Sequence, residues 1–172
     1  MIAVDSAKLE RCSIGRKNRF IGPMSVSILE GATIDKNNFF ECGWWITEPS
    51  QQSERYTRTL SLGKRTLVTS EHYFDVVGTI TLGDDSWIAG VGSQFWTHGA
   101  GSPKSSIHIG EQCYIGSAVR FSPGTAIGDR CLVAMGSVVT KAFSQSHCVI
   151  SGVPASIKKE QYDWKTQQTH GE

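Results

Sequence analysis

The sequence lacks several features that define large functional classes. Its 172 residues carry 17 Lys and Arg against 16 Asp and Glu, so the formal net charge is only +1. This balance gives no reason to expect binding to nucleic acid or to an acidic membrane surface. No apolar run reaches the roughly 18 residues that a membrane helix needs, and no charged-then-apolar leader lies near Met1. We therefore expect a cytoplasmic protein without membrane insertion.

The cysteines also lack a recognisable pattern. There are five of them, an odd number, and no two form a CxxC pair. Because cytosolic reductants oppose disulfides and a buried cysteine behaves as a small apolar residue, we expect free thiols.

What the sequence does contain is a repeat of six residues. An aliphatic residue followed by glycine recurs at Ile109-Gly110, Ile115-Gly116 and Ile127-Gly128, and the same spacing continues at Phe121, Val133 and Val139. The phase extends back through Gln94, Ile88 and Leu82, and less regularly from Ile14 to Val68. This period is neither the 3.6 of a helix nor the 2 of a simple strand, and hexapeptide repeats are typical of a parallel β-helix. The pattern predicts an all-β triangular prism with one strand and one corner per repeat.

Two interruptions and a tail complete the organisation. We assign residues 1–155 to the β-helix, with an irregular excursion over about 37–58 and a loop over about 95–106. Residues 156–172 are predicted to form a tail, either a short helical cap or a docking arm. Within the coil, Cys113 and Cys131 should lie one turn apart, with backbones about 4.8 Å from each other.

At this point the chain resembles the hexapeptide-repeat acyltransferases, the left-handed β-helix enzymes that include galactoside, maltose and polysaccharide O-acetyltransferases. The resemblance covers roughly residues 82–159. It is most specific from Ile127-Gly128-Asp129 through Gly136-Ser137-Val138-Val139-Thr140-Lys141 and at Gly152-Val153-Pro154-Ala155. The resemblance implies a left-handed coil, a homotrimer with active sites between subunits, and acetyl-coenzyme A as the donor.

His98 is the candidate general base. The reaction needs a group that takes a proton from the attacking hydroxyl or amine, and an imidazole suits this near neutral pH. His98 closes the strand that begins at Gln94 and precedes a loop that interrupts the repeat, where rigid scaffolds commonly carry function. Thr97-His98 also resembles the Thr-His or Ser-His of the family's active loop.

The resemblance also implies a set of donor-binding residues. Ser117, Met135, Thr140 and Lys141 match positions that contact coenzyme A, mostly through backbone atoms. Ser156 and Lys159 match positions that carry cationic side chains near the nucleotide phosphates. Only Lys159 keeps the charge here, with Lys158 beside it as a substitute.

The acceptor is less clearly marked. We name Trp96, Thr97 and His72 as candidate acceptor contacts, since an aromatic face packs well on a sugar ring. A structural corner role is the competing interpretation of His72, and an interface or outer-wall role is favoured for Trp44 and Trp45. The chain has Ile88-Ala89-Gly90-Val91 where many sugar acetyltransferases have Pro-Asn, so a hydrogen-bonding Asn is missing.

The sequence predicts O-acetylation of a sugar or of a polysaccharide or glycoconjugate precursor, with alternatives. The same base would serve N-acetylation of an amino sugar, and the prism could be a non-catalytic assembly subunit. A zinc site of the γ-carbonic anhydrase type needs closely spaced histidines, whereas the loop between His98 and His108 supplies no third ligand, so we expect no metal.

Overall fold

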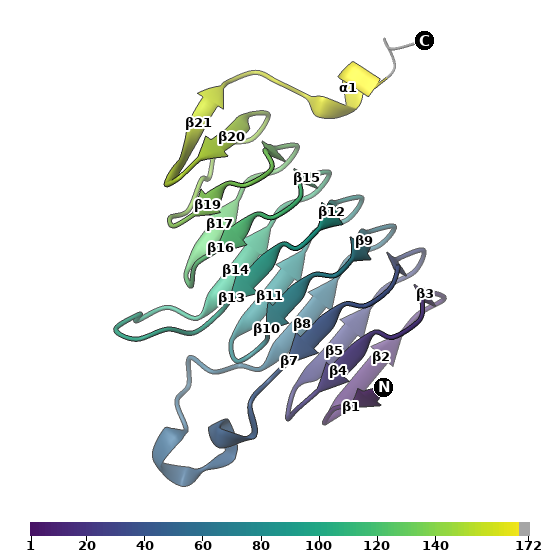
Figure 1. Ribbon diagram of the computed structural model, residues 1–172, viewed down its shortest axis with the longest axis vertical. Helices are drawn as coiled ribbons and strands as arrows, with labels where there is room; N and C mark the ends of the chain where they lie inside the picture. Colours follow the sequence, from purple (N-terminus) through teal and green to yellow (C-terminus); the bar gives the residue numbers. More distant parts are fainter. Residues whose placement is uncertain (169–172) are drawn as a thin grey trace.

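The chain winds into a three-sided coil of short strands. The computed structural model describes residues 1–168 (Figure 1). Each of the first six turns contributes one strand to each of three sheets, and strands from successive turns pair in parallel. The parallel β-helix predicted from the six-residue period is confirmed.

The sheets have seven, six and eight strands, and we name them A, B and C. Sheet A contains β1 (Ile2–Ala3), β4 (Arg19–Ile21), β7 (Phe39–Glu41), β10 (Tyr73–Asp75), β13 (Gln94–Trp96), β16 (Arg120–Phe121) and β19 (Val138–Val139). Sheet B contains β2 (Ser6–Leu9), β5 (Ser25–Ile28), β8 (Thr59–Leu62), β11 (Thr79–Leu82), β14 (Ser106–Ile109) and β17 (Thr125–Ile127). Sheet C contains β3 (Ser13–Ile14), β6 (Thr33–Ile34), β9 (Leu67–Ser70), β12 (Trp87–Val91), β15 (Tyr114–Ile115), β18 (Leu132–Val133), β20 (Val149–Gly152) and β21 (Ala155–Lys159).

Inward-pointing side chains from successive turns stack on one another along the prism. On sheet A the stack is phenylalanine, with ring centroids 4.3 to 4.9 Å apart, and it comprises Phe20, Phe40, Phe74, Phe95 and Phe121. Since strand residues alternate in direction, the residues on either side of each phenylalanine point outward. The stack therefore fixes which sheet A residues face the surface.

The corner between sheets B and C uses the same backbone conformation in every turn. The positive-φ residue there is Arg11, Arg65, Asp85, Gln112 or Arg130, and in one turn it is Gly31 at φ 75°. Polar residues stand at this corner in place of glycine in most turns, which explains why the sequence pattern is not simply a glycine repeat.

Both interruptions of the repeat leave the prism at one corner, where sheet A passes to sheet B. The first insertion, residues 43–57, follows β7 and contains two 3₁₀ turns, η1 (Trp44–Thr47) and η2 (Pro49–Gln51). The second, residues 97–105, follows β13, and Figure 1 shows both projecting from the same side. The first is shorter than the predicted 37–58 because β7 is a regular strand paired with β4 and β10.

The C-terminal segment differs from the predicted tail. Residues 156–159 belong to β21, which pairs antiparallel with β20, so sheet C continues beyond the expected boundary at 155. The helical part is α1 (Trp164–Gln168). Trp164 is buried, its indole N–H donates to the Gln112 carbonyl at 2.6 Å, and its ring packs on Trp87 and Tyr114. The helix therefore covers the outside of sheet C.

Three cysteines form a column inside the C-terminal turns. Cys113, Cys131 and Cys148 are fully buried free thiols, and the sulfurs of Cys131 and Cys148 lie 3.3 Å apart. Burial raises the pKa of the Cys113 thiol to about 12, so this group stays protonated and acts as a core residue.

Among residues 1–168, no helix has the length and apolar character of a membrane span.

Candidate active site

His98 lies at the corner between sheets A and B, two residues after β13 ends. Its Nδ1 is 2.7 Å from Oδ2 of Asp75, the last residue of β10 in the preceding turn. The imidazole is 36% exposed, whereas the Asp75 side chain is 5% exposed. A buried carboxylate thus meets a half-exposed imidazole.

The neighbours of Asp75 determine which nitrogen of His98 carries the proton. The Asp75 Oδ2 atom accepts the backbone N–H of Thr97 at 2.9 Å and that of His98 at 3.1 Å. An oxygen that already accepts two amide protons acts as a carboxylate acceptor, so Nδ1 of His98 is the donor in their contact. Nε2 makes no hydrogen bond within the described chain and is left as the basic atom.

Thr97 secures this arrangement from inside the corner. Its hydroxyl donates to the Asp75 carbonyl at 2.7 Å and accepts the Gly78 N–H at 2.8 Å, and the residue is fully buried. Thr97 was predicted to contact the acceptor, but burial prevents this. It ties two successive turns together and thereby positions His98.

The sequence pattern gave no sign of Asp75, although the register of sheet A explains its place. In the parallel pairing of β10 with β13, Asp75 lies opposite Trp96. The chain turns the corner directly after Trp96, which brings the Thr97 and His98 amides over the carboxylate. A carboxylate ending the preceding sheet A strand is the signal that could have found it.

The two insertions are braced against each other beside His98. Arg55 donates through Nη1 to the Ser102 carbonyl at 2.7 Å and through Nη2 to the Tyr56 hydroxyl at 2.6 Å, while the Ser105 hydroxyl donates to the Arg55 carbonyl. Because each insertion supplies partners to the other, neither is a free loop.

Trp45 is a site residue that sequence reasoning missed. Its ring centroid lies 5.4 Å from that of His98 and 5.9 Å from that of Tyr56. The favoured interpretation placed Trp44 and Trp45 at an interface or outer wall. Trp44 is indeed 60% exposed, but Trp45 forms a side wall of the His98 imidazole.

Aromatic side chains also line the outer face of sheet A near His98. Trp96 is 38% exposed and its ring lies 4.9 Å from Tyr73, which in turn lies 5.8 Å from Phe39. The Tyr73 hydroxyl donates to Glu41 at 3.1 Å, and burial together with this carboxylate raises the pKa of Tyr73. Trp96 is therefore exposed on this face, and its contact with an acceptor stays a prediction.

His72 is not available to an acceptor. It is 1% exposed at the corner between sheets C and A, where its Nδ1 accepts the Ser93 N–H at 3.0 Å. Its Nε2 lies 3.1 Å from the Thr69 hydroxyl. Burial lowers the pKa of His72 to about 4, so the ring is neutral at pH 7. The geometry supports the structural corner interpretation, and the predicted acceptor contact is withdrawn.

The predicted donor residues fall into three groups. Ser117 and Met135 occupy the sheet C to sheet A corner of successive turns, and Met135 is 73% exposed. Thr140 and Lys141 follow β19 at the same corner as His98, two turns further on. Ser156, Lys158 and Lys159 lie on β21, with Lys159 Nζ 4.7 Å from the Tyr162 ring. Sheet A separates the first group from the second, so one chain does not bring all of them together.

The two histidines weighed for zinc have separate partners. His98 contacts Asp75, whereas His108 lies on the outer face of sheet B with Nδ1 2.8 Å from the Thr81 hydroxyl. Among the described residues, no three His, Cys, Asp or Glu side chains are close enough to hold a metal.

Known proteins share both the repeat and the fold. Residues 106–141 match the family model described as the hexapeptide repeat of succinyl-transferase. A maltose O-acetyltransferase from Clostridium difficile 630 superimposes with a TM-score of 0.58 at 22% identity, over 75% of this chain and 66% of that one. This chain therefore spans just under two thirds of that enzyme.

Two further structures extend the comparison. A hexapeptide-repeat acetyltransferase from Vibrio cholerae O1 biovar eltor, complexed with acetyl-coenzyme A, gives 0.57 at 25% identity over 78% of this chain and 73% of that one. A galactoside acetyltransferase in complex with coenzyme A gives 0.54 at 21% identity over 90% and 67%. The resemblance to hexapeptide-repeat acetyltransferases and the left-handed β-helix predicted with it are confirmed.

Proposed function

Starting from a chain with the hexapeptide repeat and the fold of these acetyltransferases, we propose an acetyltransferase that uses acetyl-coenzyme A. The acceptor is a hydroxyl of a sugar or of a polysaccharide or glycoconjugate precursor, and the reaction takes place in the cytoplasm. The observation that carries the proposal is the pairing of the half-exposed His98 with the buried Asp75 at 2.7 Å.

The reaction follows from the free Nε2 atom of His98. As the acceptor oxygen attacks the thioester carbonyl, its proton moves to Nε2, and the new positive charge is stabilised by the Asp75 carboxylate. The tetrahedral intermediate then collapses, the carbon–sulfur bond breaks, and the proton on Nε2 passes to the departing thiolate. The products are an acetyl ester and free coenzyme A, with no net change in protons.

The donor would lie between two subunits of a homotrimer. Ser117 and Met135 stand on one corner of the prism, and Thr140 and Lys141 stand on another. A single cleft can use both groups only if one corner comes from each of two neighbouring chains. Exposed Val91, at 49%, and Met135 on the first corner offer apolar surface for such a contact.

The nucleotide end of the donor would reach β21. Lys158 and Lys159 are exposed there and supply the positive charge that phosphates require, and Ser156 precedes them on the same strand. The acceptor would approach from the insertion side, between Trp96 and Trp45, so that its hydroxyl reaches Nε2.

The test is calorimetric titration with acetyl-coenzyme A together with its slow hydrolysis, followed by thiol release. We expect micromolar binding and hydrolysis that is lost in His98→Ala. His108→Ala is the matched control, because His108 is also a surface histidine with a hydrogen-bond partner at Nδ1, here the Thr81 hydroxyl, but stands outside the site. Absence of acetyl-coenzyme A binding would refute the enzyme and favour the assembly subunit. Acetylation of amino sugars alone would replace O-acetylation by N-acetylation.

A further inference from the structure

A cavity of about 490 Å³ lies in the first insertion and is linked to His98 through two aromatic rings. Tyr56 lines it, Tyr56 packs edge-on against Trp45, and Trp45 packs against His98. Its volume is in the range of small-ligand pockets. The cavity is therefore distinct from the position proposed for the acceptor hydroxyl and is connected to it through these two packed rings.

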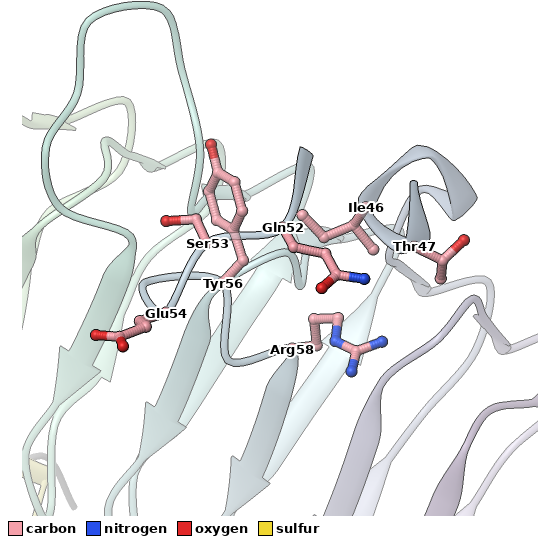
Figure 2. Close-up of a pocket in the computed structure, with 7 residues that line it drawn as sticks. All are labelled: Ile46, Thr47, Gln52, Ser53, Glu54, Tyr56 and Arg58. Atoms are coloured by element: carbon pink, nitrogen blue, oxygen red, sulfur yellow. The ribbon is translucent and has the colours of Figure 1, made fainter. Parts of the chain in front are cut away.

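The lining is polar and carries opposite charges at its two sides. Figure 2 shows Arg58 and Gln52 on one side and Glu54 on the other, with Tyr56 between them. The remaining lining residues are Ile46, Thr47 and Ser53. Hydroxyl groups of a ligand could bond to the amide and the carboxylate, and one ring face could pack on Tyr56.

Arg58 is the cationic residue of the lining, and most of its binding capacity is unused. Within residues 1–168 its one ion pair is to Asp5 at 3.5 Å, and both side chains are more than a third exposed. Such a contact contributes little free energy. By contrast, both terminal nitrogens of Arg55 are occupied by the brace between the insertions. A planar guanidinium with most of its donors free is suited to bidentate binding of a carboxylate.

We propose that this cavity binds a hexuronic acid unit of the acceptor glycan. Its carboxylate pairs with Arg58, and its ring hydroxyls bond to Gln52 and Glu54. The unit that is acetylated is its neighbour in the chain, which places the reacting hydroxyl at His98. This assignment of an acidic acceptor rests on the proposed function, but the binding itself does not require acetyl-coenzyme A.

The test compares two probes that differ only in the carboxylate, methyl β-D-glucuronide and methyl β-D-glucoside. Each is titrated against the intact protein by saturation-transfer NMR. We expect millimolar binding of the glucuronide, at least tenfold tighter than that of the glucoside, and weaker in high salt. Equal affinities for the two probes would overturn the proposal.

Three variants locate the effect. Arg58→Met should abolish the preference for the glucuronide, and Arg58→Lys should keep part of it. Asp5→Asn is the matched control, because it removes the same ion pair while leaving the guanidinium in place, and it should retain the preference. Loss of the preference in Asp5→Asn, or its survival in a folded Arg58→Met, would show that Arg58 is not the ligand.

The two proposals can fail separately. Acetyl-coenzyme A binding without a glucuronide preference would remove the acidic acceptor and leave the acetyltransferase. A glucuronide preference without acetyl-coenzyme A binding would leave a site for acidic sugars on a protein that is not an acetyltransferase.

Discussion

His72 and His98 both stand at corners of the same prism, yet their surroundings give them opposite properties. At His72, Nδ1 accepts a backbone N–H and the ring is 1% exposed. At His98, Nδ1 faces a carboxylate and the side chain is 36% exposed. Burial accounts for His72, because it lowers the pKa of that ring to about 4. At His98 the carboxylate orients the ring through Nδ1, and Nε2 is left without a partner within the described chain.

The comparison shows that a corner histidine becomes a candidate base only when the preceding turn supplies a carboxylate to it. Asp75 fulfils this condition for His98, whereas the partner of His72 is the backbone amide of Ser93. Substitutions of His98, Asp75 and His72 should distinguish residues that act in the reaction from residues that stabilise the fold.

The largest effect is expected for His98→Ala. Turnover should fall by at least about 10², as expected for loss of a general base, with little change in coenzyme A affinity. Initial rates and calorimetric binding measure the two quantities. A variant with normal turnover would contradict the assignment of His98.

Asp75→Asn should have the next largest effect, roughly 10-fold to 100-fold in kcat, since the amide cannot stabilise the protonated imidazole. A double-mutant cycle distinguishes positioning from structural damage. In the His98→Ala background, Asp75→Asn should cost little further activity, because its effect passes through His98. Additive losses would indicate a purely structural role.

His72→Gln should leave kcat near normal and lower the free energy of unfolding by about 1–3 kcal/mol, since buried hydrogen bonds are disturbed. Thermal or denaturant unfolding measures the loss. A large fall in kcat without loss of stability would restore His72 to the site.

His72 also predicts how stability depends on pH. Its pKa is lowered from 6.5 to about 4 by burial. The unfolded chain binds this proton first, so the free energy of unfolding should fall as pH drops from about 6.5 toward 4, by about 3 kcal/mol in all. Denaturant titrations at several pH values should show a smaller fall in His72→Gln, and an equal fall would assign the effect to other groups.

The smallest effect is expected for the paired change Lys158→Ala and Lys159→Ala. These exposed cations should act on the donor phosphates alone, so the KM for acetyl-coenzyme A should rise roughly 3-fold to 10-fold while kcat stays constant. Lys17→Ala with Lys36→Ala is the control of equal charge change on earlier turns of the coil. An unchanged donor KM would place the phosphate site elsewhere.

The fold could be predicted because the repeat is local in sequence. The repeat identifies Ile109, Ile115 and Ile127 as inward-pointing residues, and its period of six predicts a β-helix. The N-terminal turns were harder to predict from the sequence. The first insertion lies between the interior residues Phe40 and Phe74, so their spacing in the sequence does not follow the six-residue period. Their alignment becomes visible only once the strands are paired.

The site was only partly predictable for a related reason. His98 stands out beside the interruption of the repeat, but Asp75 is one turn earlier and acts through register. Trp45 reaches His98 along an insertion whose path the repeat does not set. Thr97 was assigned to the active-site corner, but its side chain was expected to face the acceptor and is buried instead. The sequence does not distinguish the two, because a threonine after a strand can face either the core or solvent.

The hydrogen bond from His98 to Asp75 crosses from one turn of the coil to the preceding one. The 22 residues between them must therefore keep their length parity, because a shift of one position would turn the carboxylate to the opposite face of its strand. The first insertion and the part of the second that follows His98 lie outside this span, so their lengths can change without moving the pair. Related chains could thus change their acceptors by exchanging the insertions, while the regular coil keeps His98 and Asp75 in the same relative position.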